Sequence, residues 1–164
     1  MKALEEAFYF NMIITYAQGI HMLTRASAEF NYGLNLAEIA KIWRGGCIIR
    51  SALLPDFYKV YKKNPQLPNM LLDKRIARMI RNKEKKLRTI IKQATALKIP
   101  IPGLSSALAY FDAYCSSDLP TNLIQAQRDF FGAHMYQRVD KLGMFHNEWQ
   151  PLPDHKKEEV EHKP

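Results

Sequence analysis

Apolar residues recur at helical spacing through the start of the chain, and this spacing predicts one long helix over residues 2–31. Two apolar stripes follow this helix and cover most of its surface: Leu4, Phe8 and Met12, and Phe10, Ile13, Ile14, Ala17 and Ile20. A helix that is apolar nearly all round lies in the centre of a helical domain. We expect it to end at Tyr32 and Gly33, because glycine readily takes the left-handed conformation that closes a helix.

The next segments carry start signals for helices. Asn35 can cap a short helix over residues 36–43, with Glu38 three residues on, as in a capping box. The glycine pair that follows ends this helix. A further helix is expected over residues 47–61, with Pro55 at a kink or at a new first turn.

The clearest amphipathic pattern covers residues 70–98, as one helix or as two pieces. A proline-rich segment ends it, and a mostly apolar helix follows over residues 104–114. The last predicted helix opens at Pro120 and reaches about Phe131, where Gly132 stops it. No segment alternates between apolar and polar residues as a strand would. The predicted fold is therefore all-α, an array of about six helices.

An extended tail is expected after these helices. Residues 1–134 form the predicted helical domain, whereas residues 135–149 mix turn residues with single aromatic residues and cannot make a core of their own. Their Phe and Trp side chains are therefore expected to dock elsewhere. Residues 150–164 are polar and bounded by proline, and we expect them to be disordered.

The composition, with 47% hydrophobic and 24% charged residues among 164, is typical of one soluble domain with a core. Cys47 and Cys115 are far apart and lack metal-ligand spacing, so neither a disulfide framework nor a metal site is predicted. Glu5 and Glu6 stand where a signal peptide would carry basic residues, and polar residues interrupt the uncharged stretch 7–23. We expect a cytoplasmic protein without a membrane span.

The formal net charge of +8 favours an anionic partner, which charge alone does not identify. Six basic residues form one stripe on the amphipathic pattern: Lys74, Arg78, Arg81, Lys85, Arg88 and Lys92. Such a stripe is either a nucleic-acid footprint or the solvated face of the helix. Because no aromatic residues for base stacking are interleaved with it, we favour the solvated face.

No local motif for catalysis occurs in the sequence. It contains no metal cluster, no nucleophile beside a base and no glycine-rich phosphate loop. We interpret Asp112 and Asp129 as helix caps or ion-pair partners rather than as an acid and base pair. The sequence thus predicts no catalytic residue in this chain.

The segment 125–134, Gln-Ala-Gln-Arg-Asp-Phe-Phe-Gly-Ala-His, brings candidate anion ligands to a helix end. Arginine offers a fixed fork of donors that suits phosphate, and a protonated histidine donates from both ring nitrogens. On an unbroken helix, Arg128 and His134 would lie well apart around the axis. A break at Gly132 would let them converge.

At this point the order of segments resembles decarboxylating, NADP-linked 6-phosphogluconate dehydrogenase. The matching stretches are residues 16–19 (YAQG), 42–51 (IWRGGCIIRS), 105–112 (SSALAYFD), 119–120 (LP), 123–134 (LIQAQRDFFGAH) and 145–149 (FHNEW). The likeness covers residues 3–149 in the right order. It implies the C-terminal helical part of that family, in which Phe130 stands where tyrosine is frequent.

The resemblance implies a homodimer in which residues 135–149 dock on the partner subunit. In the family, an arginine and a histidine of the QAQRD-FGAH motif bind the substrate phosphate in the neighbouring subunit, and these positions correspond to Arg128 and His134. The implied reaction belongs to the pentose phosphate pathway and converts 6-phosphogluconate and NADP to ribulose 5-phosphate, carbon dioxide and reduced NADP.

The resemblance also implies that the coenzyme domain and the catalytic Lys and Glu lie upstream of this chain. We therefore expect the chain alone to bind no NADP and to be inactive. A stand-alone helical interaction module is the alternative, and a basic nucleic-acid-binding domain is a weaker one. We expect neither nucleic acid nor membrane as a partner.

Overall fold

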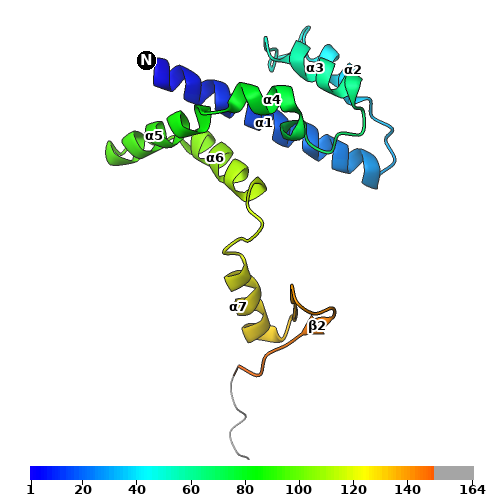
Figure 1. Cartoon of the computed structure of the whole chain (residues 1–164), viewed down its shortest axis with the longest axis vertical. Coiled ribbons are helices and arrows are strands. Elements are labelled where there is room, and N and C mark those ends of the chain that lie inside the picture. Colours follow the sequence, from blue (N-terminus) through cyan, green and yellow to red (C-terminus); the bar gives the residue numbers. More distant parts are fainter. Residues whose placement is uncertain (150–164) are drawn as a thin grey trace, which may run out of the picture. The chain divides into compact units, whose positions relative to one another are not determined.

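The computed structural model describes residues 1–149 and divides them into two compact units, Met1–Cys115 and residues 116–149. The described residues contain seven α-helices, one 3-10 turn and one small hairpin, which confirms the all-α prediction (Figure 1). Residues 150–164, predicted to be disordered, lie outside the described residues.

Helix α1 (Lys2–Glu29) is the central element of the first unit and contacts α5 (Lys83–Ala96) and α6 (Pro102–Tyr114) (Figure 1). The stripe that includes Phe10 is buried as expected. The other stripe is not, because Leu4 is 46% exposed and Phe8 is 57% exposed. The first unit therefore leaves one apolar face of its central helix open to solvent.

Helices α2 (Leu36–Ile42) and α3 (Leu54–Lys63) pack against each other. The predicted cap is confirmed, since Asn35 accepts a hydrogen bond from the Glu38 backbone N–H over 3.2 Å. The prediction of a helix over residues 47–61 is wrong in its first half. Residues 47–50 form a turn whose Ile49 carbonyl accepts a hydrogen bond from the Tyr16 hydroxyl, and the helix begins only at Leu54.

The segment 70–98 is broken twice. It contains a 3-10 turn η1 (Met70–Leu72), helix α4 (Lys74–Ile80) and α5. Asp73 caps α4 by accepting hydrogen bonds from two backbone N–H groups, and Asn82, with φ of 64°, turns the chain before α5. The six basic residues therefore do not form the single straight stripe that the sequence predicted. Arg88 is moreover paired with Glu84 and Asp112.

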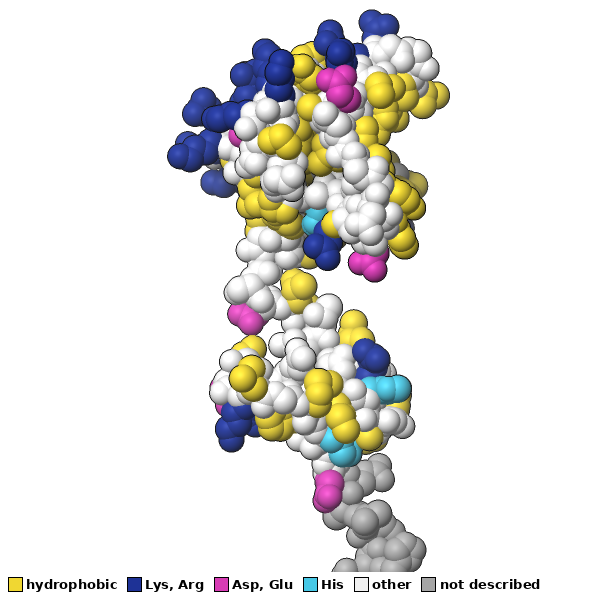
Figure 2. All heavy atoms as spheres, turned by 90° about the vertical axis from the view of Figure 1, so that its right-hand side faces the viewer, with side chains coloured by type: hydrophobic (Ala, Val, Ile, Leu, Met, Phe, Trp, Pro, Cys, Tyr) yellow, Lys and Arg dark blue, Asp and Glu magenta, His cyan; other side chains and the backbone are white. Residues whose placement is uncertain are grey.

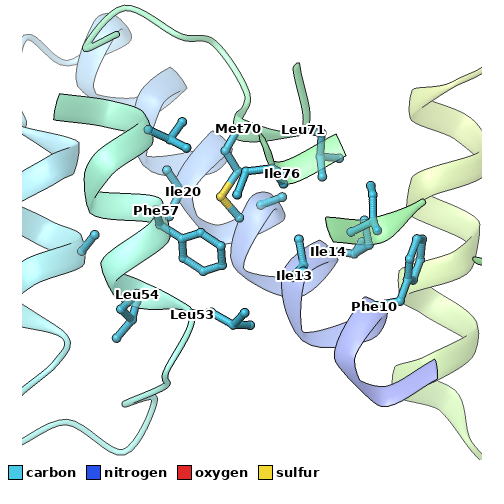
Figure 3. Close-up of a cluster of buried hydrophobic side chains, with 14 of the residues drawn as sticks. Phe10, Ile13, Ile14, Ile20, Leu53, Leu54, Phe57, Met70, Leu71 and Ile76 are labelled. Carbon is cyan, nitrogen blue, oxygen red and sulfur yellow. The ribbon is translucent and has the colours of Figure 1, made fainter. Parts of the chain in front are cut away.

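Side chains from α1, α3, η1 and α4 meet in one core (Figure 3). The ring of Phe57 on α3 lies with Met70 and Ile76 beside the α1 residues Ile13 and Ile20, all of them buried. Burial of this apolar surface is the main favourable term for folding of the first unit.

A buried polar side chain links the core to α6. Asn69 is 1% exposed, and its carbonyl oxygen accepts a hydrogen bond from the Leu71 backbone N–H over 2.9 Å. Its amide donates to the Tyr110 hydroxyl over 3.1 Å. Because a buried amide without partners is costly, these bonds fix η1 against α6.

The second unit is built on α7 (Asn122–Gly132). An antiparallel hairpin of two short strands, β1 (Tyr136–Gln137) and β2 (Met144–Phe145), follows it. This hairpin was not expected, because two-residue strands are too short to show alternation. Among the described residues, no helix is both long and apolar enough to span a membrane.

Candidate functional site

Arg128 and His134, the predicted phosphate ligands, lie at and just beyond the C-terminal end of α7, and both side chains are exposed. The helix stops where the sequence predicted: Gly132 is its last residue, and Ala133 adopts a left-handed conformation with φ of 51°. Met135 is also left-handed, with φ of 62°. The chain therefore turns sharply on both sides of His134.

The guanidinium of Arg128 is held by a side chain of its own helix, α7. One of its nitrogens donates to the side-chain carbonyl of Gln125 over 3.1 Å, and the amide of Gln125 donates in turn to the Met135 carbonyl. Guanidinium groups carry five N–H donors. Among residues 1–149, Gln125 is the one hydrogen-bond partner of the Arg128 guanidinium, so other donors of Arg128 can bind an anion from solvent.

The imidazole of His134 lies against Gly132. A methyl group added to Gly132 would stand 3.3 Å from the His134 Nε2, closer than an ordinary contact. Glycine at this position thus leaves room for the ring. Among the described residues, no hydrogen bond or ion pair joins Arg128 to His134, so their joint action on one ligand remains a prediction.

Asp129 is the residue whose importance the sequence did not reveal. It is 1% exposed, and its carboxylate accepts four hydrogen bonds. One oxygen accepts from the Met135 backbone N–H over 3.0 Å and from His146 Nδ1 over 2.8 Å. The other accepts from the Asn147 backbone N–H over 3.0 Å and from the Trp149 indole over 2.8 Å.

These contacts set the charge state of Asp129. Burial by itself would raise its pKa, but the four hydrogen bonds, from Asn147, His146, Trp149 and Met135, outweigh burial and hold the pKa well below its usual range. The carboxylate is therefore ionised at neutral pH. Asp112 forms an ion pair with Arg88 as expected, whereas Asp129 acts as a shared hydrogen-bond acceptor, with His146 as one of its donors.

This lowered pKa predicts acid resistance of the second unit. A carboxyl group whose pKa is lowered in the folded state contributes its full stabilisation at pH values above its pKa in the unfolded chain, about 3.9. This stabilisation is lost as the pH falls through the pKa of the folded state. The indole N–H signal of Trp149 in an NMR titration should therefore keep its folded position down to about pH 4. A midpoint above that pH would contradict the ionised carboxylate as its acceptor.

A hollow of about 450 Å³ lies between α7 and the hairpin, lined by residues that include Asn122, Gln125, Tyr136, Arg138 and Trp149. Arg138 and Asp140 form an ion pair on this side. Neither Arg128 nor His134 is among its lining residues, so the hollow is not the predicted phosphate site. No group of three or more possible metal ligands occurs in the described part of the chain.

Comparison with known proteins shows what this chain is similar to. A family model described as the C-terminal domain of 6-phosphogluconate dehydrogenase matches residues 1–149. The NADP(+)-dependent, decarboxylating 6-phosphogluconate dehydrogenase of Bacillus subtilis is 47% identical over 149 residues, which are 91% of this chain and 32% of that protein. The Escherichia coli enzyme is 46% identical with the same coverage.

A solved structure agrees with these sequences. The 6-phosphogluconate dehydrogenase of Plasmodium falciparum, determined in its apo form and with NADP+ and 6-phosphogluconate, superposes with a TM-score of 0.86 at 47% identity. The match covers 90% of this chain and 32% of that one. This chain thus spans about a third of the length of the relatives it matches. From Met1 to Trp149, it belongs to the 6-phosphogluconate dehydrogenase family and corresponds to its C-terminal domain.

Proposed function

We propose that this chain acts as the C-terminal part of a decarboxylating, NADP-dependent 6-phosphogluconate dehydrogenase and supplies the substrate-phosphate ligands Arg128 and His134 to a neighbouring subunit. The observation that carries the proposal is the family match over residues 1–149. Within the complete enzyme, this C-terminal part binds and orients the substrate. Phosphate binding far from the reacting carbon helps, because its free energy can position the reacting end of the substrate.

The chemistry at the end of α7 supports the phosphate role. The guanidinium of Arg128 is exposed to solvent, and His134 follows after a sharp turn. Donors of this kind suit the oxygens of a phosphate monoester. The sequence contains no glycine-rich turn that could cradle a dinucleotide, so we assign NADP to the upstream part of the complete enzyme.

The open face of α1 supports the proposed homodimer. A hollow of about 350 Å³ on this face is lined mainly by apolar residues, among them Phe8, Met12, Trp43 and Ile48. Figure 2 shows yellow apolar side chains exposed on the face in view of the first unit. Large exposed apolar patches mark surfaces that other protein covers. In the proposed dimer, residues 135–149 dock on the partner subunit.

A hybrid enzyme tests the proposed function. In it, residues 1–149 of this chain replace the matching C-terminal part of the Bacillus subtilis relative. We expect the hybrid to oxidise 6-phosphogluconate with NADP, whereas the 164-residue chain alone should show neither NADP binding nor turnover. Turnover is measured by the absorbance of reduced NADP, and NADP binding by calorimetry.

Two controls make the result of the hybrid decisive. The upstream part of the relative without any C-terminal part should be inactive, and the hybrid should elute as a dimer with unchanged affinity for NADP. A dimeric hybrid that binds NADP yet does not oxidise 6-phosphogluconate would contradict the proposal. So would turnover by the isolated chain.

A further inference from the structure

We propose that Asp129 is a positioning residue of the phosphate site, which holds both Arg128 and His134 in place through Met135 and Gln125. The inference rests on the proposed function of Arg128 and His134. Asp129 itself is buried and does not face solvent, so it is not a ligand of the phosphate. Its role is to fix the turn from which the ligands act.

Asp129 closes the second unit through both oxygens of its carboxylate. Each of its two carboxylate oxygens accepts one backbone N–H and one side-chain N–H. The donors come from two places, the turn at Met135 and the segment from His146 to Trp149. One ionised side chain therefore ties both the turn and the tail to α7.

Met135 links Asp129 to the turn around His134. Its backbone N–H is bonded to Asp129, and its carbonyl accepts from the amide of Gln125. Both ends of this residue are thus attached to α7. His134 lies between Ala133 and Met135, which are both left-handed, so fixing Met135 also fixes the backbone of His134.

Gln125 connects this turn to Arg128. The same Gln125 side chain that donates to Met135 accepts a hydrogen bond from the Arg128 guanidinium over 3.1 Å. A chain of contacts therefore runs from Asp129 through Met135 and Gln125 to Arg128. If the contacts of Asp129 are weakened, Arg128 and His134 both lose their fixed positions. Ligand groups that are displaced by about 1 Å lose much of their effect.

The substitution Asp129→Asn in the hybrid enzyme tests this role. Asparagine keeps the size of the side chain, but its NH₂ group faces two donors wherever it points, so two of the four hydrogen bonds are lost. We expect the KM for 6-phosphogluconate to rise about tenfold, which is the change in affinity expected when one hydrogen bond to a charged group is weakened. Any fall in kcat should be confined to 6-phosphogluconate, because only this substrate uses phosphate binding to position its reacting end.

Gluconate, which lacks the phosphate, separates positioning from general damage to the fold. Its kcat/KM should be the same in the Asp129→Asn hybrid as in the unsubstituted hybrid. Asp118→Asn is the matched control, because it makes the same chemical change at an exposed carboxylate of the same unit, outside residues 135–149. This control should leave both substrates unaffected.

A milder variant covers the case in which Asp129→Asn does not fold. Trp149→Phe keeps an aromatic ring and removes only the indole donor to Asp129. We expect a smaller rise in the KM for 6-phosphogluconate, again without an effect on gluconate. Adding Asp129→Asn to an Arg128→Ala hybrid should raise the KM by much less than it does alone, because coupled residues are not additive.

The outcomes distinguish this inference from the proposed function. If Arg128→Ala raises the KM for 6-phosphogluconate but Asp129→Asn and Trp149→Phe do not, the positioning role is wrong and the phosphate site stands. If Arg128→Ala has no effect either, the proposed function fails. A fall in kcat for both substrates with unchanged KM would make Asp129 merely structural and overturn the inference.

Discussion

Replacing Arg128 by alanine in the hybrid enzyme should weaken 6-phosphogluconate binding by about 10- to 100-fold, because a hydrogen bond to a charged group is worth about 1.5–3 kcal/mol. NADP binding should hardly change. His134→Ala should have a smaller effect than Arg128→Ala, because an imidazole offers fewer N–H donors than a guanidinium. The affinities for 6-phosphogluconate are measured by titrating the substrate at a fixed concentration of NADP.

Mixing two defective hybrids tests whether Arg128 acts across the subunit boundary. One hybrid carries Arg128→Ala, and the other lacks the catalytic Lys that the family resemblance implies for the upstream part. After random subunit exchange, half of the dimers are mixed, and each contains one complete site if Arg128 acts in trans. Activity at low substrate should return to about one quarter of the unsubstituted hybrid.

The alternative arrangement gives a different result. If each chain used its own Arg128, both sites of a mixed dimer would be defective, and mixing would restore nothing. Differently tagged chains prove that mixed dimers have formed. Proven mixed dimers without recovered activity would refute a shared site.

Phe57→Ala should destabilise the isolated chain by about 3–5 kcal/mol, because it removes a buried ring from the core. The ring is fully buried and lies 5.3 Å from that of Tyr16 between ring centres. A loss of this size is a large part of a typical stability of about 5–15 kcal/mol. Urea unfolding followed by far-UV circular dichroism measures the change in the first unit.

Phe8→Ala is the matched control for this experiment, since Phe8 is 57% exposed on the open face of α1. It should change the free energy of unfolding by only about 0.5 kcal/mol. It should instead reduce self-association, which we expect for the isolated chain and which sedimentation measures. Equal destabilisation by both substitutions would mean that the core has been placed wrongly.

Local signals made much of the fold predictable. Asn35 and Gly132 mark helix ends through the chemistry of a few neighbouring residues, and the structure places both ends where these signals indicated. The buried stripe of α1 follows from periodicity alone. Periodicity does not reveal which of two apolar stripes meets the rest of this chain, so the exposure of Phe8 was not predictable.

The error at residues 47–50 has a physical reason. The segment is apolar, yet Ile48 is fully exposed, so no packing offsets the cost of starting a helix there. Gly46, with φ of 64°, turns the chain immediately before it. The two-piece alternative for residues 70–98 is confirmed by α4 and α5, but the break could not be placed at Asn82, because asparagine in a helical pattern reveals its left-handed conformation only in three dimensions.

At the candidate site, residue types were easier to predict than the contacts that hold them. The sequence motif pointed to Arg128 and His134, and the resemblance implied their role. The motif did not identify Asp129 as an acceptor of four hydrogen bonds, because three of the donors come from a segment without any periodicity. Contacts of this kind depend on tertiary structure rather than on spacing along a helix.

The four hydrogen-bond donors around Asp129 also affect how residues 135–149 bind a neighbouring subunit in the proposed dimer. The longest link, from Asp129 to Trp149, spans 20 residues, and the loop-closure entropy that opposes such a link grows only slowly with its length. A segment that folds only on association loses about 2–5 kcal/mol of its interaction free energy to ordering. The segment from Met135 to Trp149 is ordered within its own chain beforehand. In the proposed dimer, less of the free energy of its contacts is therefore lost to ordering.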